Sequence, residues 1–182
     1  KTIDITNYDK NNDFQISEPL ELSELKLEID SIHTHEMIKH NNKLYINSTA
    51  DGKIYIMDIN NFKTLEILKL ATPKNHINTL AIKNNYLYCM YHNRGLSDVY
   101  VFDINKKSKN KNGKINSNGK VNILESLEFI KKYESMGMKC HNITFWKDGF
   151  LYLESEDGKL TYFNELTKKK EVIFIREGKF LK

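Results

Sequence analysis

Cysteine, proline and glycine are all scarce in this sequence. Its 182 residues include two cysteines, two prolines and eight glycines. Cys89 and Cys140 are too few for a disulfide framework in a chain of this length, and no Cys-x-x-Cys pair suggests a zinc ribbon. The composition also excludes collagen-like and linker-like sequence. No run of about 18 apolar residues occurs, so we expect no membrane-spanning segment.

The chain also lacks a strong excess of charge of one sign, because 28 basic and 24 acidic residues leave a net charge of +4. Part of this excess comes from residues 106–120, which hold six lysines and which we expect to form a solvated insertion. No segment gathers basic residues on one face, so nucleic acid is not an expected partner. Residues 1–10 lack the apolar core of a signal peptide, and we expect a cytoplasmic protein.

Three segments of the chain resemble one another without gaps. The windows 33–46, 76–89 and 140–153 begin at His33, His76 and Cys140, with offsets of 43 and then 64 residues. The longer second offset is explained mostly by the Lys/Asn/Gly-rich residues 105–120. A period near 43 residues lies in the range of β-propeller blades.

Each window has two apolar stretches separated by a polar pair, which is typical of a β-hairpin. The pairs are Asn41-Asn42, Asn84-Asn85 and Asp148-Gly149. Third and fourth strands rich in β-branched and aromatic residues follow. Residues 121–133 stand where the second repeat needs its fourth strand, although Ile123, Leu127 and Ile130 would also share one helix face.

The sequence therefore predicts an all-β fold, a partial β-propeller of about three to four blades. The repeats are expected at about 33–70, 76–133 and 140–176, with residues 1–30 as the remnant of an earlier blade. Propellers usually close with four to eight blades, so we expect the chain to be a piece of a longer protein.

Several stretches support a family resemblance. His76-Ile77-Asn78, His141-Asn142, Phe150-Leu151-Tyr152 and residues 176–182 resemble an uncharacterised group of bacterial propeller repeats, and more distantly the six-bladed propellers that include gluconolactonases and NHL-repeat proteins. The resemblance implies a closed ring with a ligand site near the central channel. In the lactonase-type relatives a divalent metal is held there by Glu, Asn and Asp. This sequence offers His and Asn instead, with Glu36 as the only nearby acid.

The candidate site residues lie where each innermost strand begins. His35, Asn78 and Asn142 occupy one aligned position, and His33, His76 and Cys140 stand two residues earlier. Because side chains alternate along a strand, the two positions can share a face and form a polar ring of imidazole, amide and thiol groups. Alternatively, these residues cap strand ends and satisfy buried backbone groups.

Other residues are weighed in the same way. Arg94 in a turn, and more weakly Arg176, could hold an anionic group. Cys140 and His141 are adjacent on a strand and should point to opposite faces, which argues against a Cys–His dyad. We expect Cys89 to be buried and Trp146 to pack between blades. The ligand-binding candidates are His33, His35, His76, Asn78, Arg94, His141, Asn142 and Arg176.

Two functions remain open. The first is a non-catalytic propeller module that recognises a small anionic ligand, a glycan or a protein. The second is a metal-dependent hydrolase, lyase or oxidase, with a divalent transition metal on His33, His35, His76 and His141, since imidazole suits zinc, copper and iron.

Overall fold

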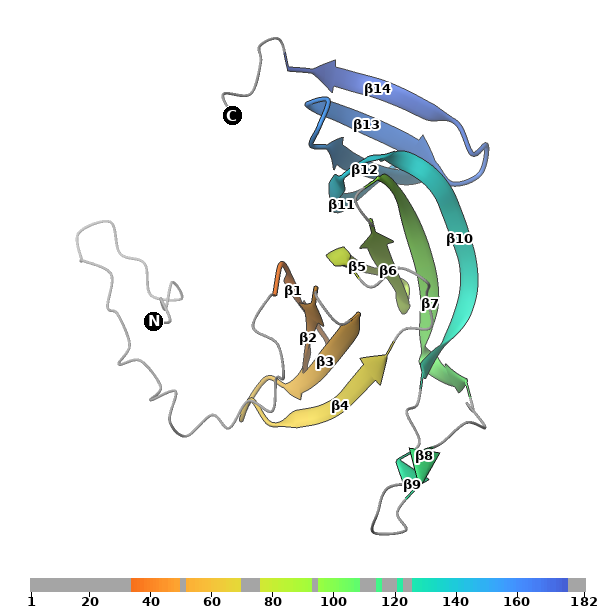
Figure 1. Ribbon diagram of the computed structural model, residues 1–182. Helices are drawn as coiled ribbons and strands as arrows, with labels where there is room; N and C mark the ends of the chain where they lie inside the picture. The colour runs from red at the N-terminus through yellow and green to blue at the C-terminus, as the bar shows by residue number, and fades with distance from the viewer. Residues whose placement is uncertain are drawn as a thin grey trace, which may run out of the picture.

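The structure is a computed structural model that describes residues 34–49, 52–69, 76–92, 95–108, 114–115, 121–122 and 126–176. All regular elements in these ranges are β-strands, which form three four-stranded antiparallel sheets and one short hairpin (Figure 1). No helix in the described ranges is long and apolar enough to cross a membrane. The predicted remnant at residues 1–30 lies outside these ranges.

Each sheet is a meander whose strands follow one another in space in chain order. Sheet 1 consists of β1 (Met37–His40), β2 (Lys43–Ser48), β3 (Lys53–Asp58) and β4 (Thr64–Lys69). Sheet 2 consists of β5 (Ile77–Lys83), β6 (Tyr86–Tyr91), β7 (Leu96–Ser108) and β10 (Ser126–Met138). Sheet 3 consists of β11 (Cys140–Trp146), β12 (Gly149–Glu154), β13 (Lys159–Asn164) and β14 (Lys170–Ile175). A hairpin of β8 (Lys114–Ile115) and β9 (Val121–Asn122) separates β7 from β10.

The three sheets are stacked side by side with their first strands on one side (Figure 1). The inner strands β1, β5 and β11 contact one another in that order, whereas β4, β10 and β14 are the outer strands. This is the arrangement of propeller blades, so the chain is an open, partial β-propeller, as predicted. The fourth strand of the second repeat is also confirmed as β10, and its helical alternative is wrong.

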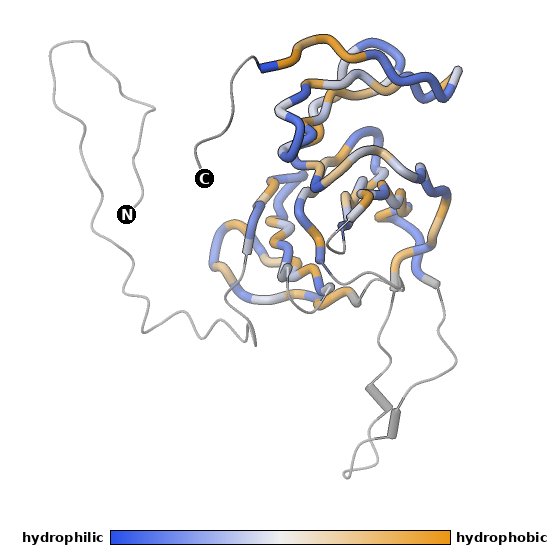
Figure 2. The backbone as a smooth tube through the Cα atoms, turned by 45° about the horizontal axis from the view of Figure 1, so that its top comes forward, coloured by the Kyte–Doolittle hydropathy of each residue, from blue (hydrophilic) through white to orange (hydrophobic). Residues whose placement is uncertain are grey.

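Two apolar layers hold the sheets together, and alternating hydropathy along the strands reflects them (Figure 2). Tyr45, Ile54 and Ile56 of sheet 1 pack against one side of sheet 2. The other side of sheet 2 packs on sheet 3, where Phe150 and Phe163 are buried. The layer between sheets 1 and 2 also contains Leu68, Ile77, Leu80, Leu87, Cys89, Tyr91, Tyr100, Phe102 and Leu127. The layer between sheets 2 and 3 also contains Ala81, Tyr88, Met90, Val99, Val101, Tyr133, Met136, Cys140, Ile143 and Tyr152.

The hairpin turn of the third repeat differs from the prediction by one residue. The strands close at Trp146 and Gly149, so the turn is Lys147-Asp148 and not Asp148-Gly149. Gly149 lies inside β12, where a Cβ would come within 1.8 Å of the Phe163 carbonyl oxygen. That glycine permits close approach of two strands rather than a turn.

This correction changes which residues are equivalent. Lys83 and Trp146 end the first strands of their hairpins, so the second and third repeats are 63 residues apart and not 64. A shift of one residue exchanges the two faces of a strand. Cys140 is therefore equivalent to buried Ile77, and His141 is equivalent to Asn78.

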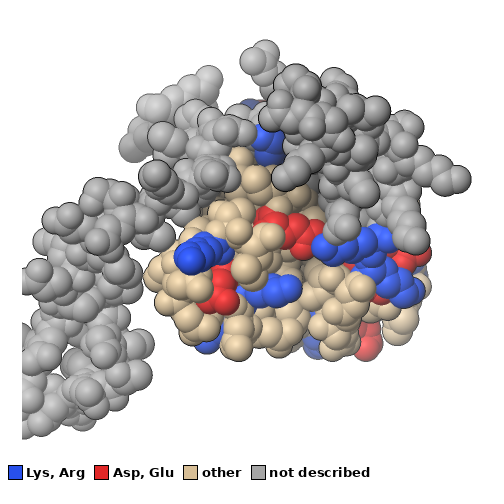
Figure 3. Space-filling view, turned by 90° about the horizontal axis from the view of Figure 1, so that it is seen from below, with Lys and Arg blue, Asp and Glu red and all other residues tan. Residues whose placement is uncertain are grey.

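Charged side chains of both signs are interspersed on the described surface seen from below (Figure 3). Several form exposed ion pairs, such as Lys139 with Glu156 at 3.6 Å. Exposed pairs of this kind contribute little to stability.

Candidate functional site

Four histidine side chains meet at the end of the sheets where the inner strands begin. The ring centroids of His35 and His76 are 5.8 Å apart, and those of His76 and His92 are 4.4 Å apart. His141 closes the group, at 6.1 Å from His92 and 6.4 Å from His35, to which it is stacked. We call these four residues the imidazole cluster. Three of them, His35, His76 and His141, were predicted site residues, and the structure brings them together.

All three sheets contribute to the cluster. His35 stands just before β1, His76 just before β5, and His141 within β11, while His92 follows β6. Because the inner strands β1, β5 and β11 are neighbours, the residues at their beginnings lie close together. A rigid scaffold thus fixes four imidazoles that are distant in sequence, an arrangement suited to binding.

Burial and mutual repulsion disfavour the charged form of three of these imidazoles. Burial, followed by the charge of His35, lowers the pKa of His76. Burial, followed by His35 and His76, lowers the pKa of His141. The pKa of His92 falls from 6.5 to about 4 because of burial, the other three imidazoles and Lys139. These three side chains are therefore neutral at pH 7, each with one N–H donor and one acceptor nitrogen.

His92 was not among the predicted site residues. It follows the last residue of β6, and its backbone N–H donates to the His76 carbonyl at 3.1 Å. The sequence contains a usable signal, because counting outward from the Asn84-Asn85 turn places His92 opposite Ile77 and hence beside His76. The Nδ1 atom of His92 is buried and has no hydrogen-bond partner among the described residues.

A buried amide joins sheet 1 to sheet 2 directly below the cluster. The Asn47 side-chain oxygen accepts hydrogen bonds from the backbone N–H groups of His35 at 3.1 Å and Glu36 at 2.8 Å. Its amide nitrogen donates to the Ile77 carbonyl at 2.8 Å. Asn47 therefore fixes the segment that carries His35.

A second set of polar groups joins the inner strands at equivalent positions. The Glu36 carboxylate accepts from the Leu80 N–H at 2.8 Å and also bonds the Thr79 hydroxyl. The Thr79 hydroxyl oxygen accepts from the Asn142 N–H at 2.8 Å. Asn142 is the bulged residue of β11 and has a positive φ of 57°. Burial, opposed by these bonds, raises the pKa of Glu36.

Two predicted ring members have structural roles instead. Asn78 is buried, and its amide donates to the Cys140 carbonyl at 3.2 Å. It therefore provides a hydrogen bond for a buried backbone group, which is the alternative role given in the sequence analysis. Cys140 was expected in the polar ring, but it lies fully buried in the apolar layer between sheets 2 and 3. The one-residue error in alignment explains this difference. Burial raises the pKa of Cys140 to about 12, despite the opposing Ser97 hydroxyl. Cys89 is buried, as predicted.

The remaining candidates divide into two groups. His33 and Arg94 lie outside the described residues. Arg176 lines a surface hollow of about 320 Å³ together with His141. In the described ranges, no three His, Cys, Asp or Glu side chains are arranged to hold a metal ion. The expected divalent metal on His33, His35, His76 and His141 therefore stays a prediction.

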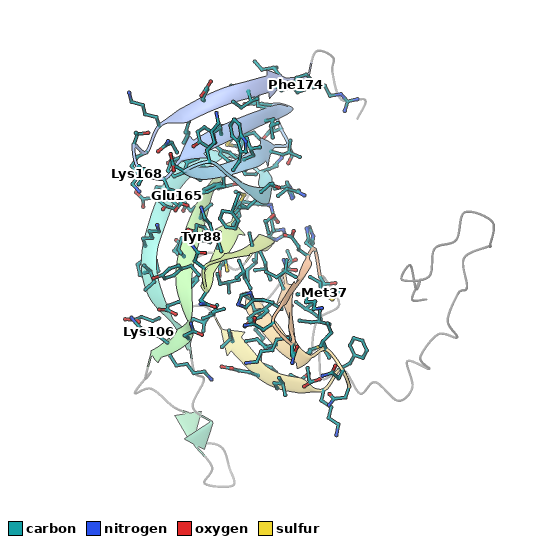
Figure 4. The ribbon with its side chains drawn as sticks, turned by 180° about the vertical axis from the view of Figure 1, so that it is seen from behind. Met37, Tyr88, Lys106, Glu165, Lys168 and Phe174 are labelled. Carbon is teal, nitrogen blue, oxygen red and sulfur yellow. The ribbon has the colours of Figure 1, made fainter. Side chains whose placement is uncertain are left out.

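A carboxylate network occupies the opposite end of sheets 2 and 3. Glu165 accepts hydrogen bonds from the hydroxyls of Tyr88 and Tyr133 and from the Lys131 ammonium group. Figure 4 labels Glu165 and Tyr88. Burial opposes ionisation of Glu165, but the bonds from Tyr133 and Lys131 outweigh it and lower the carboxyl pKa. Burial and the Glu165 charge raise the pKa of both phenols. Tyr88, Tyr133 and Lys131 each donate to Glu165, so we interpret this network as structural.

The comparisons with solved structures concern the fold alone. The β-propeller domain of Cps50 (Swd1) from Myceliophteria thermophila is 14% identical, with 92% of this chain and 48% of that domain aligned and a TM-score of 0.48. BamB from Moraxella catarrhalis is 14% identical over 76% of this chain and 47% of its own, with a TM-score of 0.40. The computationally designed Ika8 protein is 15% identical over 80% of this chain and 49% of its own, with a TM-score of 0.41.

The chain thus spans about half the length of each of these three structures. No family model and no curated protein matches it. The resemblance to gluconolactonase and NHL-repeat propellers stays a prediction. The three sheets of this chain form an open β-propeller, and the ends of its inner strands carry a group of histidines.

Proposed function

We propose that this chain is a non-catalytic binding module, and that the imidazole cluster recognises a small anionic ligand through carboxylate or phosphate oxygens. The observation that carries the proposal is the convergence of His35, His76, His92 and His141 from three sheets. No ion pair joins any of the four to a carboxylate among the described residues. Among the described residues, their side chains are therefore left without a carboxylate ion pair that an incoming anion would have to displace.

Anion binding by such a cluster must be linked to proton uptake. The lowered pKa values of His76, His92 and His141 arise from burial and imidazole repulsion. A bound anion stabilises the imidazolium forms and raises those pKa values. Affinity therefore increases as pH falls from 7.5 towards 5.5, and binding takes up protons. A neutral ligand such as an uncharged glycan would show the opposite preference, because it bonds to neutral imidazoles.

A non-catalytic role fits the surroundings of the cluster. The thiols of Cys89 and Cys140 are buried and have raised pKa values, so neither is a thiolate nucleophile at neutral pH. Glu36 is bonded to the inner strand of sheet 2 and is not positioned as a free general base. Binding alone requires only the donors that the cluster provides.

Titration calorimetry tests the proposal at pH 5.5 and 7.5 with two probes that stay dianions over this range, oxalate and sulfate. We expect His76→Gln, His92→Gln and His141→Gln each to weaken binding by about tenfold, the loss of one charge-assisted hydrogen bond. His40→Gln is the matched control, because His40 ends β1 at the other end of the sheet and contacts Asn85. Binding that is equal in all four variants, or that strengthens with rising pH, would contradict the proposal.

A further inference from the structure

Comparison of the three repeats shows which side of each sheet packs on the next sheet. The side of sheet 1 that carries Tyr45 packs on sheet 2, and the equivalent side of sheet 2, with Tyr88 and Met90, packs on sheet 3. The corresponding positions in sheet 3 are Leu151 and Leu153 of β12. Leu153 is 44% exposed, whereas its equivalent Met90 is fully buried. Sheet 3 therefore carries a sheet-packing surface that nothing in the described chain covers.

This surface is mostly apolar, and Glu171, which pairs with Tyr162, lies on the same side of sheet 3. We call it the open face, made of Trp146, Leu151, Leu153, Leu160 and Phe174. Phe174 is 59% exposed and lies on the outermost strand, away from sheet 2 (Figure 4). Trp146, expected to pack between blades, is instead 40% exposed and contacts Tyr162. Leu153, Leu160 and Phe174 line the hollow of about 320 Å³. A contiguous patch of this kind marks an interaction surface.

A second copy of the chain offers its own open face as a matching surface. The side of sheet 1 that faces away from sheet 2 has Leu44, Tyr55 and Met57 buried. Met37, at the edge of the same side of sheet 1, is 59% exposed, but the open face exposes more apolar side chains. Pairing through the open face joins the same surface on both copies, which is the geometry of a two-fold dimer.

The charges around the open face are complementary under such an axis. The turn before β13 carries Glu156 and Asp157, and the turn after it carries Lys168 and Lys169. A two-fold axis that lies between the sheets and perpendicular to the strands places the acidic turn of one copy against the basic turn of the other. The ion pairs that Glu156 and Asp157 make within the chain are exposed and easily exchanged.

We infer that the open face is a homodimer interface, in which sheet 3 of one copy packs face to face on sheet 3 of a second copy. Aligned sheets pack in this way in β-sandwiches. Phe174 and Leu153 of each copy are covered by the other, and the single tryptophan of the chain, Trp146, becomes buried. The inference rests on the side chains of sheet 3 and not on the proposed function, although His141 lines the same hollow.

Sedimentation equilibrium between about 1 and 100 μM tests this interface. We expect a dimer, with Trp146 emission shifting to shorter wavelength as the dimer forms. Phe174→Asp should leave a monomer. Met37→Asp is the matched control, because Met37 is also 59% exposed but lies on β1 of sheet 1; that variant should remain dimeric.

A charge exchange separates a lost interface from a damaged fold. Glu156→Lys or Lys169→Glu alone should weaken the dimer by about fivefold, and the two together should restore it. A monomer over the whole range would overturn the inference and assign the open face to a sheet from another protein. A dimer that survives Phe174→Asp, or that forms without a change in Trp146 emission, would place the interface elsewhere and also overturn it.

Discussion

Replacing Asn47 with alanine should cost more stability than any other single polar change in the described chain. The side chain is fully buried and makes three hydrogen bonds to backbone, two as acceptor from His35 and Glu36 and one as donor to Ile77. Alanine fills the space of the Cβ alone, so all three backbone groups lose their partner. These groups belong to two different sheets, and the loss weakens the junction between them.

The magnitude follows from the number of bonds. A hydrogen bond within a folded protein contributes about 1 kcal/mol net, so the variant should lose about 3 kcal/mol. That is a large fraction of the stability of a domain, typically about 5–15 kcal/mol. Asn47→Asp should be no better, because it retains the acceptor but places a charge in a buried position without a donor to Ile77.

Urea denaturation measures this difference. Asn61→Ala is the matched control: Asn61 is exposed and its side chain accepts a single hydrogen bond from the Lys63 N–H, so its loss should be within about 0.5 kcal/mol. A second readout is anion binding, since Asn47 fixes the backbone that carries His35. If Asn47→Ala lost less than about 1 kcal/mol, the reasoning that this amide joins sheets 1 and 2 would be refuted.

Three further results are expected. Gly149→Ala should destabilise the protein by about 2 kcal/mol in the same urea assay, because its Cβ would meet the Phe163 carbonyl at 1.8 Å; wild-type stability would contradict the close approach of these strands. Glu165→Gln should reduce stability at pH 7, and it should flatten the acid limb of the stability profile. The folded carboxyl pKa is below its ordinary 4.5, so its stabilisation is present above about pH 4.5 and is lost as pH falls further, and an unchanged acid limb would be contrary to this. Neither Cys89 nor Cys140 should react with Ellman's reagent in the native protein, whereas both should react in urea; fast native reaction would show that a thiol is accessible.

The repeat made the fold predictable, because hairpin pairs and strand composition are local properties of the sequence. The register of the third repeat was not predictable by the same means. Asp148-Gly149 is a strong turn signal, yet the chain turns at Lys147-Asp148 and uses Gly149 for strand contact. That choice depends on the approach of Phe163 from the next hairpin, which no local pattern records.

The site was predictable in part for the same reason. Position within the repeat brought His35 and His76 to the inner-strand ends, and His141 was included although its alignment was wrong by one residue. His92 follows the second strand of its hairpin, where no aligned window reached. Cys140 was placed in the ring only by the misalignment, which moved a core position to the polar side.

At the inner-strand ends, one set of side chains joins the sheets and the histidines form a separate set. This separation supports a binding role for the histidines. The sheets are joined there by Asn47, Asn78, Glu36 and Thr79, whose side chains bond across the gaps between sheets. No imidazole of the cluster makes a hydrogen bond of this kind with another described residue. Their burial carries a penalty below about pH 6.5, because three of them resist protonation in the folded state while the unfolded chain accepts protons freely. His76, His92 and His141 make no hydrogen bond across the junction and weaken the fold in acid, so a ligand explains their convergence better than packing alone. Glutamine at His76, His92 or His141 should accordingly leave stability at pH 7.5 unchanged and increase it at pH 5, as urea denaturation at the two pH values would show. A loss of stability at pH 7.5 would mean that the cluster is part of the scaffold.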